Sequence, residues 1–291
     1  HPNYGFLDFT HKESRQERFA IIEEAVTEYP VDGFELQLNH NPYYFHPEDV
    51  KRGTSIMTDW IGQIYETLKG SKPDGELVVN IPDRLEDCLS AGLDPEKWIK
   101  LGIVDVIVAE SFGDKYQVKP LADYRPMVKM AEGTKCRVMA VLNSSLHSDR
   151  LSEAPVSMIR AMACNYWAQN IDGIYISEWF TQWPYEAPFY EKLRELLHPD
   201  IMDHKDKFYF VPTISDLNKN KHNPLTRPLP AKLEINKPVS VKFSITDDLP
   251  KWSKVGRIHE VLLRIRVTDD TELDQLSFKI NDKTLPDTLM R

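Results

Sequence analysis

The first 180 residues alternate between apolar runs of strand length and longer segments with helical spacing. Six apolar runs predict strands, which begin near residues 4, 31, 76, 104, 136 and 171. Segments between them place apolar residues on one helical face, as where Ile56, Trp60, Ile64 and Leu68 recur every four residues. The strands are almost continuously apolar, which is typical of a parallel sheet covered on both faces. The pattern therefore predicts an α/β fold.

Two parallel architectures fit this alternation: an open, doubly wound sheet and a TIM-type (β/α)8 barrel. A doubly wound sheet commonly binds nucleotides through a glycine-rich loop, but the sequence contains neither a G-x-G-x-x-G motif nor a P-loop motif. A barrel needs eight strands. The chain also opens directly on HPNYGFLDF, which reads as a strand rather than as a signal peptide. We therefore expect a barrel whose first two strands precede residue 1.

The pattern changes after about residue 205. Residues 205–230 are rich in Asn, Lys and Pro and predict a linker. Residues 231–291 contain alternating apolar and polar runs joined by polar turns, with no helical pattern between them. We therefore expect the barrel domain over residues 1–204 and a small antiparallel, β-sandwich-like domain over residues 231–291, whose abrupt end suggests truncation.

Charge and residue usage disfavour several classes of protein. The 36 basic and 45 acidic residues give a net charge of −9, which makes nucleic acid an unsuitable partner. No apolar run approaches the ~20 residues of a membrane-spanning helix. The cysteines are too few and too scattered for a disulfide framework or a zinc site, and the histidines lack zinc spacing. We therefore expect no metal, no cofactor and no membrane span, and buried thiols at Cys88, Cys136 and Cys164.

An ordered set of short motifs runs through residues 4–180. LDF is followed by DGFEL, PYYF, VVNIP, GLDPEKWIKLGIVD and DGIYISEW. This order resembles bacterial glycosyl-hydrolase-like proteins related to glycoside hydrolase family ten. The resemblance implies a (β/α)8 barrel that acts on carbohydrate, and it implies a secreted or cell-surface location.

The chain departs from that family at three polar positions. Gln37 stands where the family usually has an aspartate, and Asn39 stands in place of a basic residue. Asn143 occupies the place of the usual nucleophile. Two functions therefore remain open. One is hydrolysis of O-glycosidic bonds in an oligo- or polysaccharide, and the other is non-catalytic carbohydrate binding or an extracellular structural role on a degenerate barrel.

Acidic residues recur at the carboxyl ends of the predicted strands, where a barrel places its active site. They are Glu35, Asp83, Glu110 and Glu178. Glycosidases use two carboxyl groups that flank the bond to be cleaved. Glu35 and Glu110 would lie two strands apart, whereas Glu35 and Glu178 would face each other across the whole opening. We therefore predict Glu35 and Glu110 as the catalytic pair, with Glu178 contacting substrate or tuning the pair.

Other side chains near the same strand ends suit sugar binding. Aromatic rings stack on the apolar face of a pyranose, and aromatic residues follow two of the predicted strands. Amides and a carboxyl group supply hydrogen bonds to hydroxyl groups. The predicted substrate-binding residues are Gln37, Asn39, Tyr43, Tyr44, Asn80, Asp83, Asn143, Trp179 and Trp183.

Overall fold

The computed structural model describes residues 7–40, 42–110, 118–146, 153–177, 184–212, 229–258, 260–271, 274–286 and 288. The chain divides into two compact units, residues 1–247 and 248–291. Residues 231–247, which the sequence placed in the C-terminal domain, lie in the first unit. The first unit holds the five-stranded sheet and the described residues of the predicted site.

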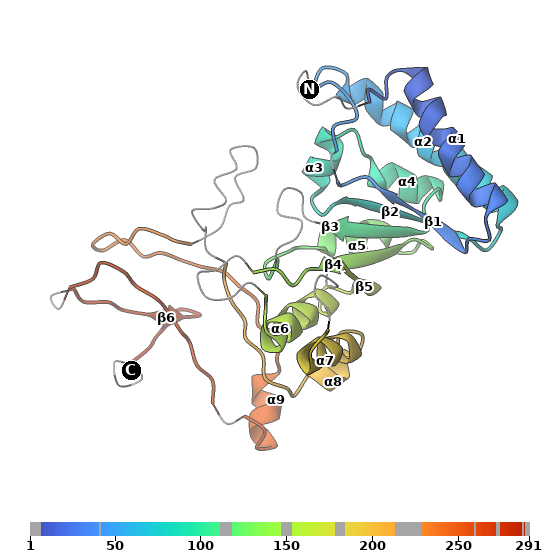
Figure 1. Ribbon diagram of the computed structural model, residues 1–291. Coiled ribbons are helices and arrows are strands. Elements are labelled where there is room, and N and C mark those ends of the chain that lie inside the picture. Colours follow the sequence, from blue (N-terminus) through green and yellow to red (C-terminus); the bar gives the residue numbers. More distant parts are fainter. Residues whose placement is uncertain are drawn as a thin grey trace. The chain divides into compact units, whose positions relative to one another are not determined.

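A five-stranded parallel sheet forms the centre of the first unit, with its strands in chain order (Figure 1). The strands are β1 (Gly33–Gln37), β2 (Glu76–Pro82), β3 (Val106–Glu110), β4 (Arg137–Leu142) and β5 (Gly173–Ile176). Each neighbouring pair is parallel. The structure therefore confirms a parallel α/β arrangement and five of the six predicted strands.

The predicted strand at residues 4–9 is wrong over the part that the structure describes. Residues 7–9 belong to no strand, and residues 4–6 lie outside the described ranges. Phe9 is instead buried, with its ring centroid 5.3 Å from that of Tyr44 and 5.1 Å from that of Trp60. The apolar run therefore supplies a ring to the core rather than a strand to the sheet.

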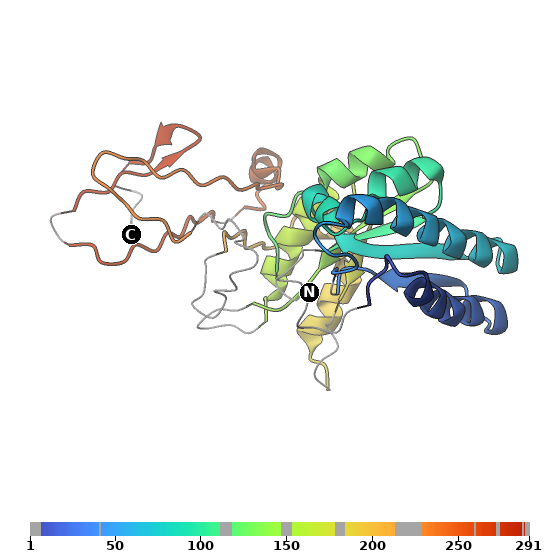
Figure 2. The ribbon, with the colours of Figure 1, turned by 90° about the horizontal axis from the view of Figure 1, so that it is seen from above.

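Helices alternate with the strands along the first unit. They are α1 (Lys12–Glu28), α2 (Val50–Ser71), α3 (Leu85–Ser90), α4 (Pro95–Leu101), α5 (Arg125–Ala131), α6 (Val156–Trp167), α7 (Ala187–Glu195) and α8 (Pro199–Met202). The long helices α1 and α2 lie side by side in two views at right angles (Figures 1 and 2). Of the α2 residues spaced for burial in the sequence, Ile64 and Leu68 are fully buried, Trp60 is 6% exposed and Ile56 is partly buried.

Helix α4 shows how the sequence fixes both ends of a short element. The Asp94 carboxylate accepts the backbone N–H of Lys97 at 3.0 Å, which satisfies a donor that the first turn leaves free. Pro95 follows in the first turn, where its missing N–H costs nothing. Gly102 takes a left-handed φ of 66° and ends the helix. These caps place β3 directly after α4.

The two faces of the sheet differ. Alternate residues such as Leu77, Val79 and Ile81 of β2 are fully buried in the main core with residues of the helices. The opposite face carries a separate apolar cluster: Val106, Val108 and Val141, with Val78, Met139 and Tyr175 packed against it. Within the described ranges this cluster comes from strands alone. Helices thus cover one face, which differs from the predicted cover on both.

The face that carries this second cluster is concave, because side chains from the two edge strands of the sheet touch. The hydroxyl of Tyr175 on β5 lies 3.0 Å from Oε1 of Glu35 on β1. In a flat sheet these strands would stand ~19 Å apart, since neighbouring strands are spaced by ~4.8 Å, and their side chains would leave the face in parallel. The sheet must therefore curl strongly, as strands do in a barrel.

The C-terminal region shows less sheet than the sequence predicts. The second unit contains α9 (Leu249–Lys254) and an antiparallel pair of strands, β6 (Lys279–Ile280) and β7 (Lys283–Thr284). Asn281 and Asp282 between them have φ values of 47° and 65°, which suit a two-residue hairpin turn. Helix α9 was not predicted; the Asp248 carboxylate caps it by accepting the Lys251 N–H at 3.0 Å. An antiparallel hairpin is therefore present, and the sandwich stays a prediction.

Candidate active site

The concave face carries a contact between a carboxylate and a tyrosine. Glu35 lies on β1 and Tyr175 lies on β5. The Tyr175 hydroxyl donates to the Glu35 carboxylate, at 3.0 Å from one oxygen and 3.2 Å from the other. Burial first, and then the negative charges of Glu35 and Glu110, raise the pKa of Tyr175 to about 12. The hydroxyl therefore keeps its proton at neutral pH and acts as a donor.

Glu110 belongs to the same face. It is the last residue of β3, two strands from Glu35, and its exposed fraction is 4%. Strand alternation places it on the same side as Val106 and Val108, which belong to the concave cluster. Glu110 therefore shares the concave face with Glu35 and Tyr175, and its charge adds to the raised pKa of Tyr175; the catalytic role of the pair stays a prediction.

Sequence reasoning missed Tyr175. The signal that could have found it was strand alternation, which puts a residue two positions after Gly173 on the inward side of β5. In the sequence this tyrosine sits among Ile174 and Ile176 and reads as one more apolar strand residue. Its hydroxyl gains a role only because β1 and β5 meet across the curl, and no local pattern records that distance.

Two asparagines lie deep at the carboxyl ends of the first two strands. Asn39 and Asn80 are each 1% exposed. The Asn39 amide nitrogen donates to the backbone carbonyl of Glu110 at 3.1 Å, and its backbone N–H donates to the Gln37 side chain at 3.0 Å. The side-chain oxygens of Asn39 and Asn80 are buried with no hydrogen-bond partner. Buried polar atoms are usually paired, so these two oxygens call for an explanation.

Gln37 and Asn143 are the departures from the family pattern. Gln37 ends β1 and is exposed, with its side-chain oxygen taken up by the Asn39 N–H. Asn143 directly follows β4 and is 5% exposed. Both positions therefore lie at the carboxyl ends of strands, as predicted, and each carries an amide where a carboxylate would be expected for catalysis.

Asp83 has a different environment from the two glutamates. It directly follows β2, and its backbone N–H donates to the Glu110 carbonyl at 2.9 Å. Burial is the largest cause that raises the pKa of its carboxyl to about 6, against opposing charges on Lys119 and Arg84. Cys88 and Tyr124, which feel its charge, belong to the main core between sheet and helices. Asp83 thus lies toward the helix side of the sheet end.

The predicted sugar-binding aromatic residues have different surroundings in the structure. Tyr44 donates its hydroxyl to the Leu38 carbonyl at 2.9 Å and packs its ring against Phe9, and burial raises its pKa far above the usual value. It therefore anchors the segment after β1 to the core. Tyr43 is 46% exposed, and its contact with a sugar stays a prediction. Glu178, Trp179 and Trp183 lie outside the described residues, so their roles stay predictions.

No cluster of three or more His, Cys, Asp or Glu side chains suited to a metal occurs in the part of the chain that the structure describes. The predicted buried thiols are free cysteines, two buried and one half-buried. Burial raises the pKa of Cys136 to about 12 and that of Cys164 to about 11, so both resist ionisation. None of the described helices has the length and apolarity needed to cross a membrane.

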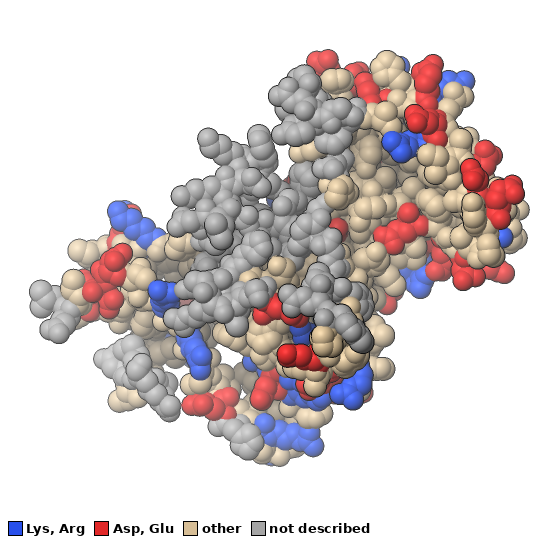
Figure 3. All heavy atoms as spheres, in the orientation of Figure 1, with Lys and Arg blue, Asp and Glu red and all other residues tan. Residues whose placement is uncertain are grey.

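Acidic and basic side chains are interspersed on the face of the molecule that Figure 3 shows. With a net charge of −9, this surface gives no broad basic stripe in that view. Binding of nucleic acid depends on such a stripe, because phosphate contacts supply most of the affinity. That the partner is not nucleic acid stays a prediction from the net charge.

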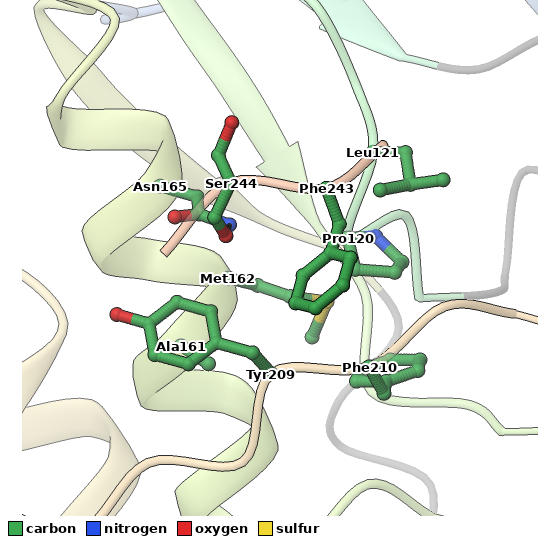
Figure 4. Close-up of a pocket in the computed structure, with 9 residues that line it drawn as sticks. All are labelled: Pro120, Leu121, Ala161, Met162, Asn165, Tyr209, Phe210, Phe243 and Ser244. Carbon is green, nitrogen blue, oxygen red and sulfur yellow. Dashed lines mark hydrogen bonds between the residues drawn. The ribbon is translucent and has the colours of Figure 1, made fainter. Parts of the chain in front are cut away.

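Two hollows in the described part of the chain are lined by none of the predicted site residues. A cavity of about 10 Å³ beside α6, shown in Figure 4, has room for about one water molecule. It is lined by Pro120, Leu121, Ala161, Met162, Asn165, Tyr209, Phe210, Phe243 and Ser244. A larger hollow of about 500 Å³, lined by Tyr65, Lys100 and Asp105 among others, lies near the amino ends of β3 and β4. Barrel enzymes act at the carboxyl ends instead.

Comparison with known proteins adds little to this geometry. No family model and no curated protein matches the sequence. Among solved structures, an endo-1,4-beta-mannanase from Rhizomucor miehei is similar with a TM-score of 0.44 and 13% sequence identity. The match covers 61% of this chain and 57% of the mannanase, so the chain spans less than two thirds of that protein. A likeness this weak assigns neither fold nor function, which depend on the residues described above.

Proposed function

We propose that this chain is a glycoside-hydrolase-like protein of the (β/α)-barrel type that cleaves an O-glycosidic bond in an oligo- or polysaccharide. One observation carries the proposal. The hydroxyl of Tyr175 contacts Glu35 on the concave face of a curled parallel sheet, and Glu110, two strands from Glu35, lies on the same face. Two carboxyl groups facing one space are what glycoside cleavage requires.

The surroundings of the two carboxyl groups suit them to different tasks. Glu35 accepts a hydrogen bond from the Tyr175 hydroxyl, which holds its carboxylate in place on the concave face, and we assign it the role of nucleophile or base. Glu110 is almost fully buried at the end of β3, and we assign it the role of the acid that protonates the leaving oxygen. Tyr175 holds Glu35 in place but takes no proton itself.

The finer assignments belong to the same proposal. The ordered motifs favour a relationship to glycoside hydrolase family ten, and an eight-stranded barrel followed by a β-sandwich-like domain. A polysaccharide substrate favours a secreted or cell-surface location. Immunodetection of the native protein in culture medium or at the cell surface is expected, and its confinement to the cytosol would contradict the location.

A screen of chromogenic glycosides and polysaccharides tests the activity. We expect the wild-type protein to release reducing ends from at least one glycan, and the double variant Glu35→Gln/Glu110→Gln to release none while keeping its circular dichroism spectrum. A binding assay on the same glycans runs beside it. Binding without turnover by the wild type would overturn the enzyme proposal in favour of a non-catalytic carbohydrate-binding protein, which Gln37 and Asn143 would then explain.

A further inference from the structure

Two carboxamide oxygens in the candidate site are buried without a partner. These are the side-chain oxygens of Asn39 and Asn80, and each residue is 1% exposed. An amide oxygen can accept two hydrogen bonds, and burying it with none is unfavourable. In a folded protein such atoms often bind a ligand or an ordered water.

Both asparagines lie near the carboxyl ends of β1 and β2, close to the proposed acid Glu110. Asn80 is on the concave side of β2, in register with Gln37 on one side and Val108 on the other. Asn39 follows β1, and its amide nitrogen is held by the Glu110 carbonyl at 3.1 Å. That hydrogen bond fixes the orientation of the Asn39 carboxamide. The position of its acceptor oxygen is therefore set by β3, the strand that carries the proposed acid.

The chemistry of these atoms selects the ligand. Amide oxygens only accept hydrogen bonds, so the group they bind must donate, as a hydroxyl does. The carboxyl groups of Glu35 and Glu110 share the concave face. The negatively charged member of the proposed pair, Glu35, repels a uronate or a sulfated sugar in a site partly withdrawn from water.

We infer that Asn39 and Asn80 form an acceptor subsite for hydroxyl groups, and that the substrate is an uncharged glycan. The inference rests on the proposed function for the position of the site and adds the substrate class. It separates neutral hexose or pentose polymers from polymers of uronic acids. The other group that could bind these oxygens is an ordered water. If a sugar hydroxyl binds Asn80, replacing Asn80 lowers the affinity for the glycan; if only water binds there, the affinity does not change.

The first test measures binding of neutral and acidic oligosaccharides by isothermal titration calorimetry. The probes are hexamers of glucose, mannose and xylose, and hexamers of galacturonate and mannuronate. We expect at least one neutral hexamer to bind more than roughly tenfold tighter than either acidic one. Equal or tighter binding of an acidic hexamer, or no binding of any neutral hexamer, would overturn the inference.

The second test replaces Asn80 with leucine, which has a similar shape and no acceptor. We expect Asn80→Leu to weaken binding of the neutral hexamer roughly tenfold, as loss of one or two hydrogen bonds requires, while the melting temperature rises or holds. Asn80→Ser serves as a second variant in case leucine does not fit. Unchanged affinity in a folded variant would mean that the oxygen binds only water.

Asn165 on α6 supplies a matched control, because its side-chain oxygen is also buried without a partner, away from the concave face. Asn165→Ala should leave hexamer affinity unchanged, whereas an equal loss there would overturn the assignment of Asn80. The two proposals fail differently. Asn80-dependent binding without cleavage defeats the enzyme proposal alone, and cleavage with a KM unaffected by Asn80→Leu defeats the subsite alone.

Discussion

Replacing Asp83 by asparagine should stabilise the protein at neutral and alkaline pH. The carboxyl of Asp83 is withdrawn from water beside Cys88, Tyr124 and Tyr166, and burial raises its pKa from 3.8 to about 6. Its ionised form is therefore less favourable in the folded chain than in the unfolded chain. An amide of the same shape removes that charge.

The size and the pH window follow from the shift. A shift of about two units corresponds to ~3 kcal/mol, and partial solvent contact reduces this to roughly 2–3 kcal/mol. Because the folded-state pKa lies above the unfolded value, the wild-type stabilisation is complete below about pH 4 and is lost as the pH rises through about 6. Asp83→Asn should therefore match the wild type near pH 4 and exceed it by roughly 2–3 kcal/mol at pH 8.

Denaturant unfolding of both proteins at several pH values between 4 and 8 measures this difference directly. At pH 8 the variant should also melt roughly 5–10 °C higher. Asp105→Asn is the control of opposite sign, since the Asp105 carboxylate accepts the Leu77 N–H at 2.8 Å and pairs with Lys69. A difference between Asp83→Asn and wild type that is constant with pH, or a less stable variant at pH 8, would refute the reasoning.

Other substitutions test the strand contacts. Tyr175→Phe removes the hydroxyl bonded to Glu35, so kcat should fall roughly 10–100-fold with KM and melting temperature nearly unchanged, and a normal kcat would contradict its positioning role. Asp172→Asn weakens the bond from the Val138 N–H, which is 2.7 Å long, and should lower the free energy of unfolding by about 1–2 kcal/mol in urea titrations. Gly33→Ala would bring a Cβ within 2.5 Å of the Glu76 carbonyl oxygen, so a loss of about 1–3 kcal/mol is expected, and unchanged stability would contradict the close approach of β1 and β2.

The sequence predicts the parallel sheet well because its strands carry their signal locally. Runs such as Val106–Ala109 are apolar on both sides, and they are buried on both sides in the structure. The run at residues 7–9 has the same apolar pattern but forms no strand. Its Phe9 is buried and packs against Trp60. Burial of one ring and pairing of a strand demand the same residue types, so composition alone does not separate them.

The C-terminal region forms less regular structure than its sequence pattern predicts, for a related reason. Its alternation is strong, but Val261 and Ile265 are 62% and 52% exposed, and residues 260–268 adopt no regular element. Alternation predicts which side chains share a face, but it does not supply a partner strand to bond with. Helix α9 arises there from Asp248 and the proline after Leu249, a capping signal that the strand pattern around it obscured.

The candidate site was predictable by position but not by contact. The sequence placed Glu35 and Glu110 at strand ends; both lie on the concave face, but Glu110 ends β3 whereas Glu35 lies in the middle of β1. Whether they share a neighbour depends on how far the sheet curls, which no single strand encodes. The role of Tyr175 and the unpartnered oxygens of Asn39 and Asn80 appear only when strands far apart in the sequence come together.

The central claim is that Glu35 and Glu110, on the concave face, do the chemistry. Glu76 is the matched comparison, because it lies on the same face at the amino end of β2 and pairs with Arg137 at 2.6 Å. The decisive measurement is kcat/KM on a cleaved glycan for Glu35→Gln, Glu110→Gln and Glu76→Gln. The account predicts losses of at least roughly 1,000-fold for the first two and less than roughly threefold for the third. Activity that survives Glu35→Gln or Glu110→Gln, or that falls as far in Glu76→Gln, would contradict it.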